Sequence, residues 1–273
     1  MKLGIGSYAF SWAVGVPGHQ PSLPVDAFSL VRKVSSLQVN CVQIADNLPL
    51  DNSDAESVSR LIELSEDLGV SVELGTRGLH IEKVTRYLDL AHQFNAPFLR
   101  LVIDDYGFEP DQSSIVRDIK QLIPICRDKN VILAIENHDR FMARQLAEIV
   151  EATDPEWVGI CLDTANSLGA GEGIAEVLEQ LWNYTVNLHV KDIKIERVPS
   201  NMGFKVTGCP AGEGVIDVPL LLHSLSKNQR FFSVTLEMWS DFLDNLDSTI
   251  AREQEWVIKS VDYLKRIIEP YQE

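Results

Sequence analysis

The sequence predicts an α/β protein built as a single (β/α)8 TIM barrel, and two observations predict this fold class. Short β-rich runs occur eight times at fairly even intervals along the 273 residues, and segments with helical periodicity lie between them. A closed barrel requires eight such alternations, whereas a doubly wound open sheet usually carries fewer strands. No composition shift or Ser/Gly-rich linker divides the chain, so we expect residues 1–273 to form one domain.

Each expected strand is a short run of β-branched and other apolar residues. The first begins almost at the amino terminus, and the last four contain a carboxylate or an imidazole at or near their ends. The expected strands are Leu3–Tyr8, Cys41–Asp46, Val70–Thr76, Phe98–Ile103, Val131–Asn137, Val158–Ala165, Thr185–Asp192 and Phe232–Trp239.

The expected helices follow from apolar spacing and from residues that start or stop a helix. In the segment 53–69, Ser53 or Asp54 can cap the start, apolar side chains recur at helical spacing, and Gly69 ends the helix. The same pattern predicts helices in the segments Ile81–Asn95, Ser113–Asn130, Met142–Thr153, Ile174–Trp182, Val218–Lys227 and Ala251–Glu269.

One connection, from Asp192 to about Arg230, is much longer than the others. Its glycines and prolines exclude a continuous helix before Asp217, so we expect a long loop at about residues 193–217. Because this loop follows the seventh strand, it is expected to lie over the mouth of the barrel, where active-site lids are found.

Composition excludes several classes of protein. The formal net charge of −16 and the pI near 4.8, with no local basic patch, argue against nucleic acid as a partner. The four cysteines are far apart and form no CxxC pair, which indicates reduced, buried thiols. The amino terminus shows no signal peptide and the chain no membrane span, so we expect a cytoplasmic protein. No nucleotide-binding fingerprint occurs, so no organic cofactor is expected.

A polar residue follows an apolar run on each of the last four expected strands: Glu136, Asp163, His189 and Glu237. Any one of them alone would be read as a solvated strand end. On four consecutive strands of a barrel they converge, and three converging carboxylates repel one another unless a cation lies between them. Oxygen ligands with one imidazole suit Mn²⁺, Mg²⁺ or Co²⁺, and Zn²⁺ also fits. The sequence therefore predicts a site for one divalent cation.

The motifs "AIENHD", "CLDTAN", "LHVKD" and "TLEMW", in this order, resemble the xylose isomerase-like TIM barrel superfamily. This sugar phosphate isomerase/epimerase group also contains endonuclease IV. The resemblance implies that Glu136, Asp163, His189 and Glu237 are the metal ligands. It also implies that Glu136 and Glu237 form the catalytic acid/base pair. The acidic charge and the lack of an Asp-x-His element after His189 argue against the endonuclease role.

We therefore expect a sugar isomerase or epimerase that acts on a small ketose or keto-sugar derivative through a metal-stabilised enediolate. The alternative is a lyase on the same site, a dehydratase or decarboxylase of an oxo-sugar acid. A sugar-binding barrel without catalysis is the third hypothesis. The expected partner is a small carbohydrate, and the fold is compatible with a homo-oligomer.

Several polar residues near these strand ends are candidate substrate contacts. Many members of the superfamily carry a histidine where this chain has Asn166, which can bind a hydroxyl group but cannot transfer a proton. Lys191 lies two residues beyond His189 and projects to the same side. The candidates are His138, Asn166, Lys191, Arg197 and Lys205, with Arg77 and His80 as further possibilities.

Overall fold

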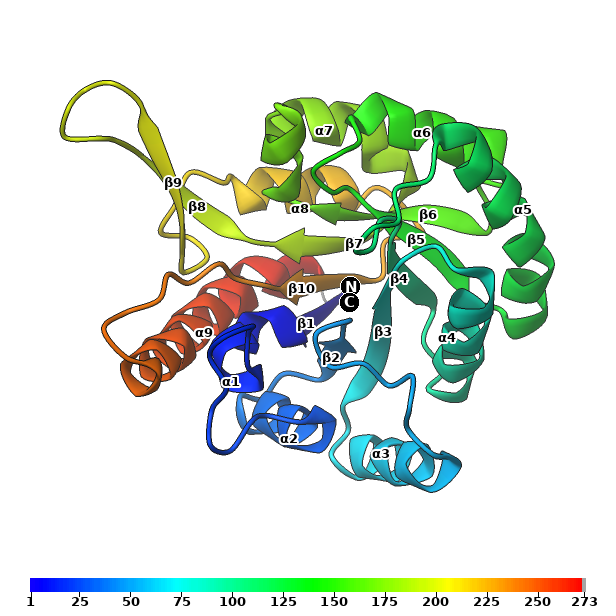
Figure 1. Ribbon diagram of the computed structural model, residues 1–273, viewed down its shortest axis with the longest axis horizontal. Helices are drawn as coiled ribbons and strands as arrows, with labels where there is room; N and C mark the ends of the chain where they lie inside the picture. Colours follow the sequence, from blue (N-terminus) through cyan, green and yellow to red (C-terminus); the bar gives the residue numbers. More distant parts are fainter. Residues whose placement is uncertain (272–273) are drawn as a thin grey trace.

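The computed structural model describes residues 1–271, and its centre is a closed barrel of parallel strands (Figure 1). Around the barrel the order is β1-β10-β7-β6-β5-β4-β3-β2. The strands are β1 (Lys2–Gly6), β2 (Cys41–Ile44), β3 (Ser71–Arg77), β4 (Phe98–Val102), β5 (Ile132–Glu136), β6 (Val158–Asp163), β7 (Thr185–Val190) and β10 (Ser233–Leu236). This arrangement confirms the predicted (β/α)8 fold.

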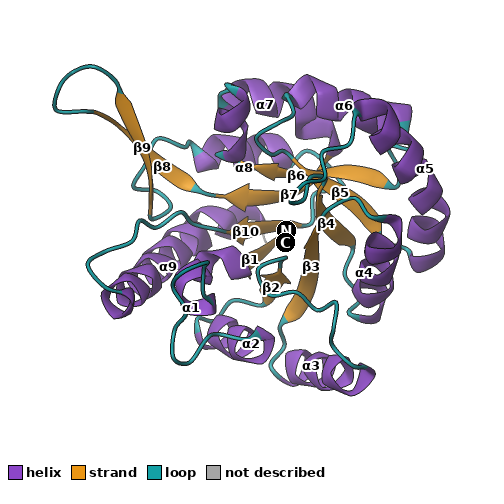
Figure 2. Cartoon of the chain, in the orientation of Figure 1, coloured by secondary structure: helices purple, strands orange, loops and turns teal. Residues whose placement is uncertain are grey.

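Helices surround the barrel (Figure 2). They are α1 (Ser11–Val14), α2 (Ala27–Ser36), α3 (Ala55–Asp67), α4 (Ile81–Gln93), α5 (Gln112–Lys129), α6 (Ala143–Ala152), α7 (Ile174–Leu181), α8 (Val218–Leu225) and α9 (Leu246–Ile268). Short 3₁₀ helices occur at η1 (Ser7–Phe10), η2 (Asn166–Ala170), η3 (Trp182–Tyr184) and η4 (Glu269–Tyr271). Among the described residues, no helix has the length and apolar character needed to cross a membrane.

Helix α2 was not among the predicted helices, although its signals are present. Asp26 caps its start by accepting a hydrogen bond from the Ser29 backbone N–H, and Leu30, Val31 and Val34 are buried. Of the two residues proposed to cap the next helix, Asp54 is the one that does so. The sequence analysis did not predict α2 because a single apolar face on a ten-residue segment is a weak signal for a helix.

The core has two parts. The larger part fills the space between the barrel and its helices, where apolar side chains from both layers are buried. A small cluster inside the barrel contains Phe98, Ala134, Cys161 and Val186. Above this cluster the barrel interior becomes polar toward the carboxyl ends of the strands, so the apolar base supports the residues of the site. All four cysteines are buried and free, as the sequence predicts.

The connection after β7 differs from the expected loop. It contains an antiparallel hairpin, β8 (Asp192–Arg197) and β9 (Phe204–Cys209), which projects away from the barrel in Figure 1. Asp192 holds the chain at the base of this hairpin, because its carboxylate accepts hydrogen bonds from the backbone N–H groups of Gly212 and Gly214. A hairpin was missed because cross-strand pairing, rather than local alternation alone, forms these strands. As expected, the next helix starts only after Asp217.

Candidate active site

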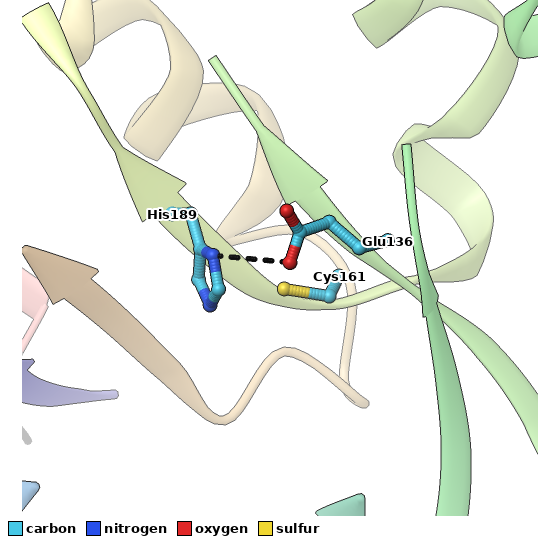
Figure 3. A group of neighbouring side chains, drawn as sticks. All are labelled: Glu136, Cys161 and His189. Atoms are coloured by element: carbon cyan, nitrogen blue, oxygen red, sulfur yellow. Dashed lines mark ion pairs between the residues drawn. The ribbon is translucent and has the colours of Figure 1, made fainter. Parts of the chain in front are cut away.

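The four predicted metal ligands converge at the carboxyl ends of the strands. His189 Nδ1 lies 3.5 Å from Glu136 Oε2, 3.9 Å from Asp163 Oδ2 and 3.4 Å from Glu237 Oε1. All four side chains are fully buried. Figure 3 shows the carboxylate of Glu136 on β5 and the ring of His189 on β7 facing each other, and β6 lies between these two strands in the barrel. The parallel barrel brings these residues together because its strand ends share one rim.

These residues fit a divalent cation. His189 Nδ1 and Glu237 Oε1 have no hydrogen-bond partner among the described residues, although both atoms are buried. Buried polar atoms are normally satisfied, so this pair indicates a missing partner. Ligand atoms of Asp163, His189 and Glu237 all lie within 4.8 Å of one another, and a carboxylate-rich set with one imidazole is suited to Mg²⁺ or Mn²⁺.

Cys161 lies near Glu136 and His189 but is a poor candidate for a ligand (Figure 3). It precedes Asp163 by two residues on β6 and therefore points into the barrel one layer deeper. Its thiol donates to Asn187 Oδ1 at 3.1 Å, and burial raises the pKa of the thiol well above its ordinary value. A cysteine ligand must lose its proton, so the oxygen-rich set is the better candidate for a metal site.

Arg100 is the main residue of the site that sequence reasoning missed. It is buried on β4, where its Nε donates to Glu136 Oε2 and its Nη1 lies 2.5 Å from Asp46 Oδ1. Burial alone would raise the pKa of Glu136, but the charges of Arg100 and Lys191 help to lower it to about 2. The available signal was a lone arginine within the apolar run "FLRLV".

Asp46 joins Arg100 to the rim of the site. Its Oδ2 accepts hydrogen bonds from the Tyr8 hydroxyl at 2.9 Å and from Arg77 Nε at 3.1 Å. Arg77 also approaches the ring of His138, with its Nη2 3.5 Å from Nε2. One carboxylate thus holds two arginines in place.

A cavity of about 360 Å³ opens above the buried ligands. Three of the predicted substrate contacts line it: His138, Asn166 and Lys191. Asn166 Nδ2 lies 2.7 Å from Glu136 Oε1. Lys191 Nζ lies 2.8 Å from Asp163 Oδ2 and 2.9 Å from Glu237 Oε2. Arg77, a further candidate from the sequence, also lines the cavity, together with Tyr8 and Trp239.

The other candidates lie elsewhere. Arg197 is on the hairpin, where its guanidinium lies 4.4 Å from the centre of the Phe204 ring. Lys205 is on the same hairpin and pairs with Asp241 at 3.3 Å. Neither lines the cavity, because the hairpin extends outward from the barrel. His80 packs against Phe108 instead.

In this protein, three carboxylates and one histidine converge at the carboxyl ends of the strands of a (β/α)8 barrel. The protein is therefore a TIM-barrel protein with a candidate metal centre. The sequence profile of one family, described as xylose isomerase-like TIM barrel, matches residues 33–267. The chain belongs to this family.

One enzyme is similar to this chain in sequence, and two solved structures are similar to it in fold. A 3-oxo-isoapionate decarboxylase of Pectobacterium atrosepticum is 29% identical over 266 residues, which are 97% of this chain and 95% of the relative. The D-psicose 3-epimerase of Clostridium cellulolyticum H10, solved with D-tagatose, has a TM-score of 0.74 at 15% identity and covers 98% of this chain and 99% of its own. A Mycobacterium smegmatis protein of the same fold, solved with magnesium, has a TM-score of 0.69 at 12% identity. The match covers 96% of this chain and 97% of that protein. The two solved structures show likeness in fold.

Proposed function

We propose that this protein is a metal-dependent lyase that removes CO₂ from an oxo-sugar acid. The observation that carries this proposal is the unequal state of the two glutamates. Glu136 is held through both oxygens, by Arg100 and by Asn166, whereas Glu237 Oε1 has no hydrogen-bond partner among the described residues. Inversion of a carbon needs two groups that exchange protons on opposite faces of the substrate. Decarboxylation needs one proton donor.

The charge balance of the site supports an anionic substrate. The buried or half-buried charged side chains that line the cavity are Glu136, Glu237, Arg77, Arg100 and Lys191, and two further carboxylates, Asp46 and Asp163, form ion pairs with these cations. This count leaves out Asp139, which is exposed. Four negative and three positive charges give the site a net charge of −1. Adding a divalent cation would bring this net charge to +1. A substrate with one carboxylate would then balance the site.

The residues that would hold the cation are Glu136, Asp163, His189 and Glu237. Their support comes from the convergence of their ligand atoms and from the unpartnered buried atoms among them. When bound, a divalent cation supplies electrophilic stabilisation of the negative charge that develops on the substrate's carbonyl oxygen. A solved protein of the same fold contains magnesium, which is consistent with this proposal.

The chain's own residues would orient the substrate and supply the proton. In a 3-oxo acid, the bond between the carboxyl carbon and C2 breaks, its electron pair forms the enediolate, and CO₂ leaves. C2 then takes up one proton, which gives a ketone one carbon shorter. The Lys191 ammonium, held 2.9 Å from Glu237 Oε2, is the protonated group we assign to this step. Arg77 and His138 on the opposite wall would bind the substrate's oxygens.

The decarboxylase relative gives independent support, because its match extends over nearly the full length of both chains. The substrate of that relative, 3-oxo-isoapionate, is an oxo-sugar acid, which is the class that the charge balance favours. We extend the reaction type, but not the particular substrate, from that relative to this protein.

A second candidate is the sugar isomerase or epimerase that the sequence predicts. The observation in its favour is that Glu136 and Glu237 line the same cavity. If Arg100 released Glu136 on binding of a neutral ketose, both carboxylates would face the substrate. The two candidates differ in whether carbon is lost.

The test is proton and carbon NMR in D₂O with Mg²⁺, with 3-oxo sugar acids in one set of samples and ketoses in the other. We expect CO₂ release from an oxo acid, with one deuteron at the former C2, and no change in the ketoses. The Glu237→Gln variant serves as the inactive control. Deuterium exchange or epimerisation of a ketose, with every oxo acid unchanged, would replace the lyase by the second candidate.

A further inference from the structure

We propose that Gln43 is a positioning residue that holds His189 in the tautomer protonated on Nε2, which leaves Nδ1 free as a metal donor. Gln43 is fully buried on β2, and its Oε1 lies 2.7 Å from His189 Nε2, on the side of the ring away from the carboxylates. The inference rests on the proposed metal site, but it is independent of the reaction that the site carries out.

The orientation of Gln43 follows from a chain of hydrogen bonds that starts at a backbone carbonyl. The Ser233 carbonyl can only accept, and Asn187 Nδ2 lies 3.1 Å from it. The same nitrogen lies 3.0 Å from Thr235 Oγ1. The amide nitrogen of Asn187 must therefore point toward β10, and its Oδ1 must point to the opposite side.

Asn187 Oδ1 in turn determines which end of Gln43 faces which neighbour. Gln43 Nε2 lies 3.3 Å from Asn187 Oδ1 and 3.3 Å from Glu73 Oε2. A flipped amide would place the Gln43 carbonyl oxygen against these two oxygens and would lose both hydrogen bonds. The carbonyl oxygen of Gln43 is therefore directed at His189.

An acceptor at Nε2 requires the imidazole to carry its proton there. A neutral ring then has its lone pair on Nδ1, which faces Glu136, Asp163 and Glu237 at 3.4–3.9 Å. A lone pair directed at three carboxylates is repulsive unless a cation lies between them. The buried amides of Gln43 and Asn187 thus hold the imidazole in the tautomer that can bind a metal ion, even without the cation. Loss of a hydrogen-bond partner of a metal-binding histidine typically weakens metal binding about 10–100-fold.

The test compares two substitutions by calorimetric titration with Mg²⁺ and with Co²⁺. Gln43→Met keeps the length of the side chain but removes the acceptor, so we expect metal affinity to fall about 10–100-fold. Gln43→Glu keeps an acceptor for Nε2–H but places a second oxygen beside Asn187 Oδ1 and Glu73 Oε2, so we expect it to lose less affinity than Gln43→Met. The matched control is Thr76→Val, which removes a buried hydroxyl on β3 away from His189 and should leave the affinity unchanged.

The Co²⁺-loaded protein adds a spectroscopic test. Its proton NMR spectrum should show one paramagnetically shifted, slowly exchanging N–H from His189, and this signal should exchange rapidly or vanish in Gln43→Met. Equal weakening in both variants, or unchanged affinity in Gln43→Met, would overturn the positioning role. A wild-type protein that binds neither cation would overturn the metal site as well, whereas metal binding without CO₂ release would contradict the proposed reaction alone.

Discussion

Arg100 and Asp46 form a buried ion pair in which Nη1 lies 2.5 Å from Oδ1, and the same guanidinium also binds Glu136. A single cation on β4 therefore neutralises two carboxylates that belong to different parts of the barrel rim. Such a group is tolerated in the interior only because both partners are present. This pairing connects the ligand side of the site to the wall that carries Arg77 and Tyr8.

Replacing Arg100 by Met should lower the free energy of unfolding by about 3–5 kcal/mol, because two buried carboxylates would lose their counter-charge. Urea denaturation at pH 7 measures this difference. Arg117→Met removes an arginine that is 64% exposed and should change the stability by less than about 0.5 kcal/mol. Equal stability of the Arg100→Met and wild-type proteins would show that the ion pairs are not needed.

Glu237→Gln should leave the fold intact and lower turnover about 10²–10⁴-fold, because the amide cannot form an ion pair with the Lys191 ammonium that supplies the proton and is a poorer ligand for a divalent cation. Turnover of the oxo acid and the thermal unfolding midpoint are measured together. Glu213→Gln, which changes an exposed glutamate, is the matched control. Full activity in the Glu237→Gln protein would remove this residue from the mechanism.

Arg77→Met should raise KM for an anionic substrate about 10–100-fold and change kcat much less. The reason is that a charge-assisted hydrogen bond to the substrate contributes about 1.5–3 kcal/mol of binding. Steady-state kinetics on wild-type and variant enzymes give both constants. Arg144→Met, at a side chain that is 75% exposed on α6, should leave KM unchanged.

Adding Mg²⁺ or Mn²⁺ to chelator-treated protein should raise the free energy of unfolding by about 2.7 kcal/mol at 100 times the dissociation constant. The cation binds the folded rim and has no comparable site in the unfolded chain. Thermal unfolding over a range of metal concentrations gives this dependence. A midpoint that stays constant with rising metal concentration would argue against the site.

Glu253 on α9 should make stability depend on pH. Its carboxylate accepts hydrogen bonds from the backbone N–H groups of Trp12 and Ala13, but burial raises its pKa from 4.5 to about 7. A raised acid pKa means that the folded state holds the proton more tightly. The stabilising contribution is therefore complete below about pH 4.5 and is lost as the pH rises through 7, by about 3 kcal/mol in total.

Urea denaturation of wild type and of Glu253→Gln at pH 5 and pH 8 checks this sign. The stability of wild type relative to the variant should fall between the two pH values, because the variant cannot titrate at this position. Glu255→Gln, on the exposed side of the same helix, controls for the general pH effect. An increase in the relative stability of wild type toward pH 8 would contradict the assigned direction.

Part of the site was predictable from sequence because it depends on local pattern and on barrel symmetry. Glu136, Asp163 and His189 each end an apolar run, and the carboxyl ends of parallel strands must meet at one rim. Lys191 could be placed near them because residues two apart on a strand share a face.

The tertiary structure alone decided which side chains touch across the barrel. The contacts of Arg100 with Asp46 and of Gln43 with His189 join residues 54 and 146 positions apart, and they depend on strand register and side-chain reach. Arg197 and Lys205 were misplaced for the same reason, because cross-strand pairing carries them outward on a hairpin. Local sequence determines the elements and the faces of each strand and helix, whereas long-range register determines which charged side chains form pairs across the barrel.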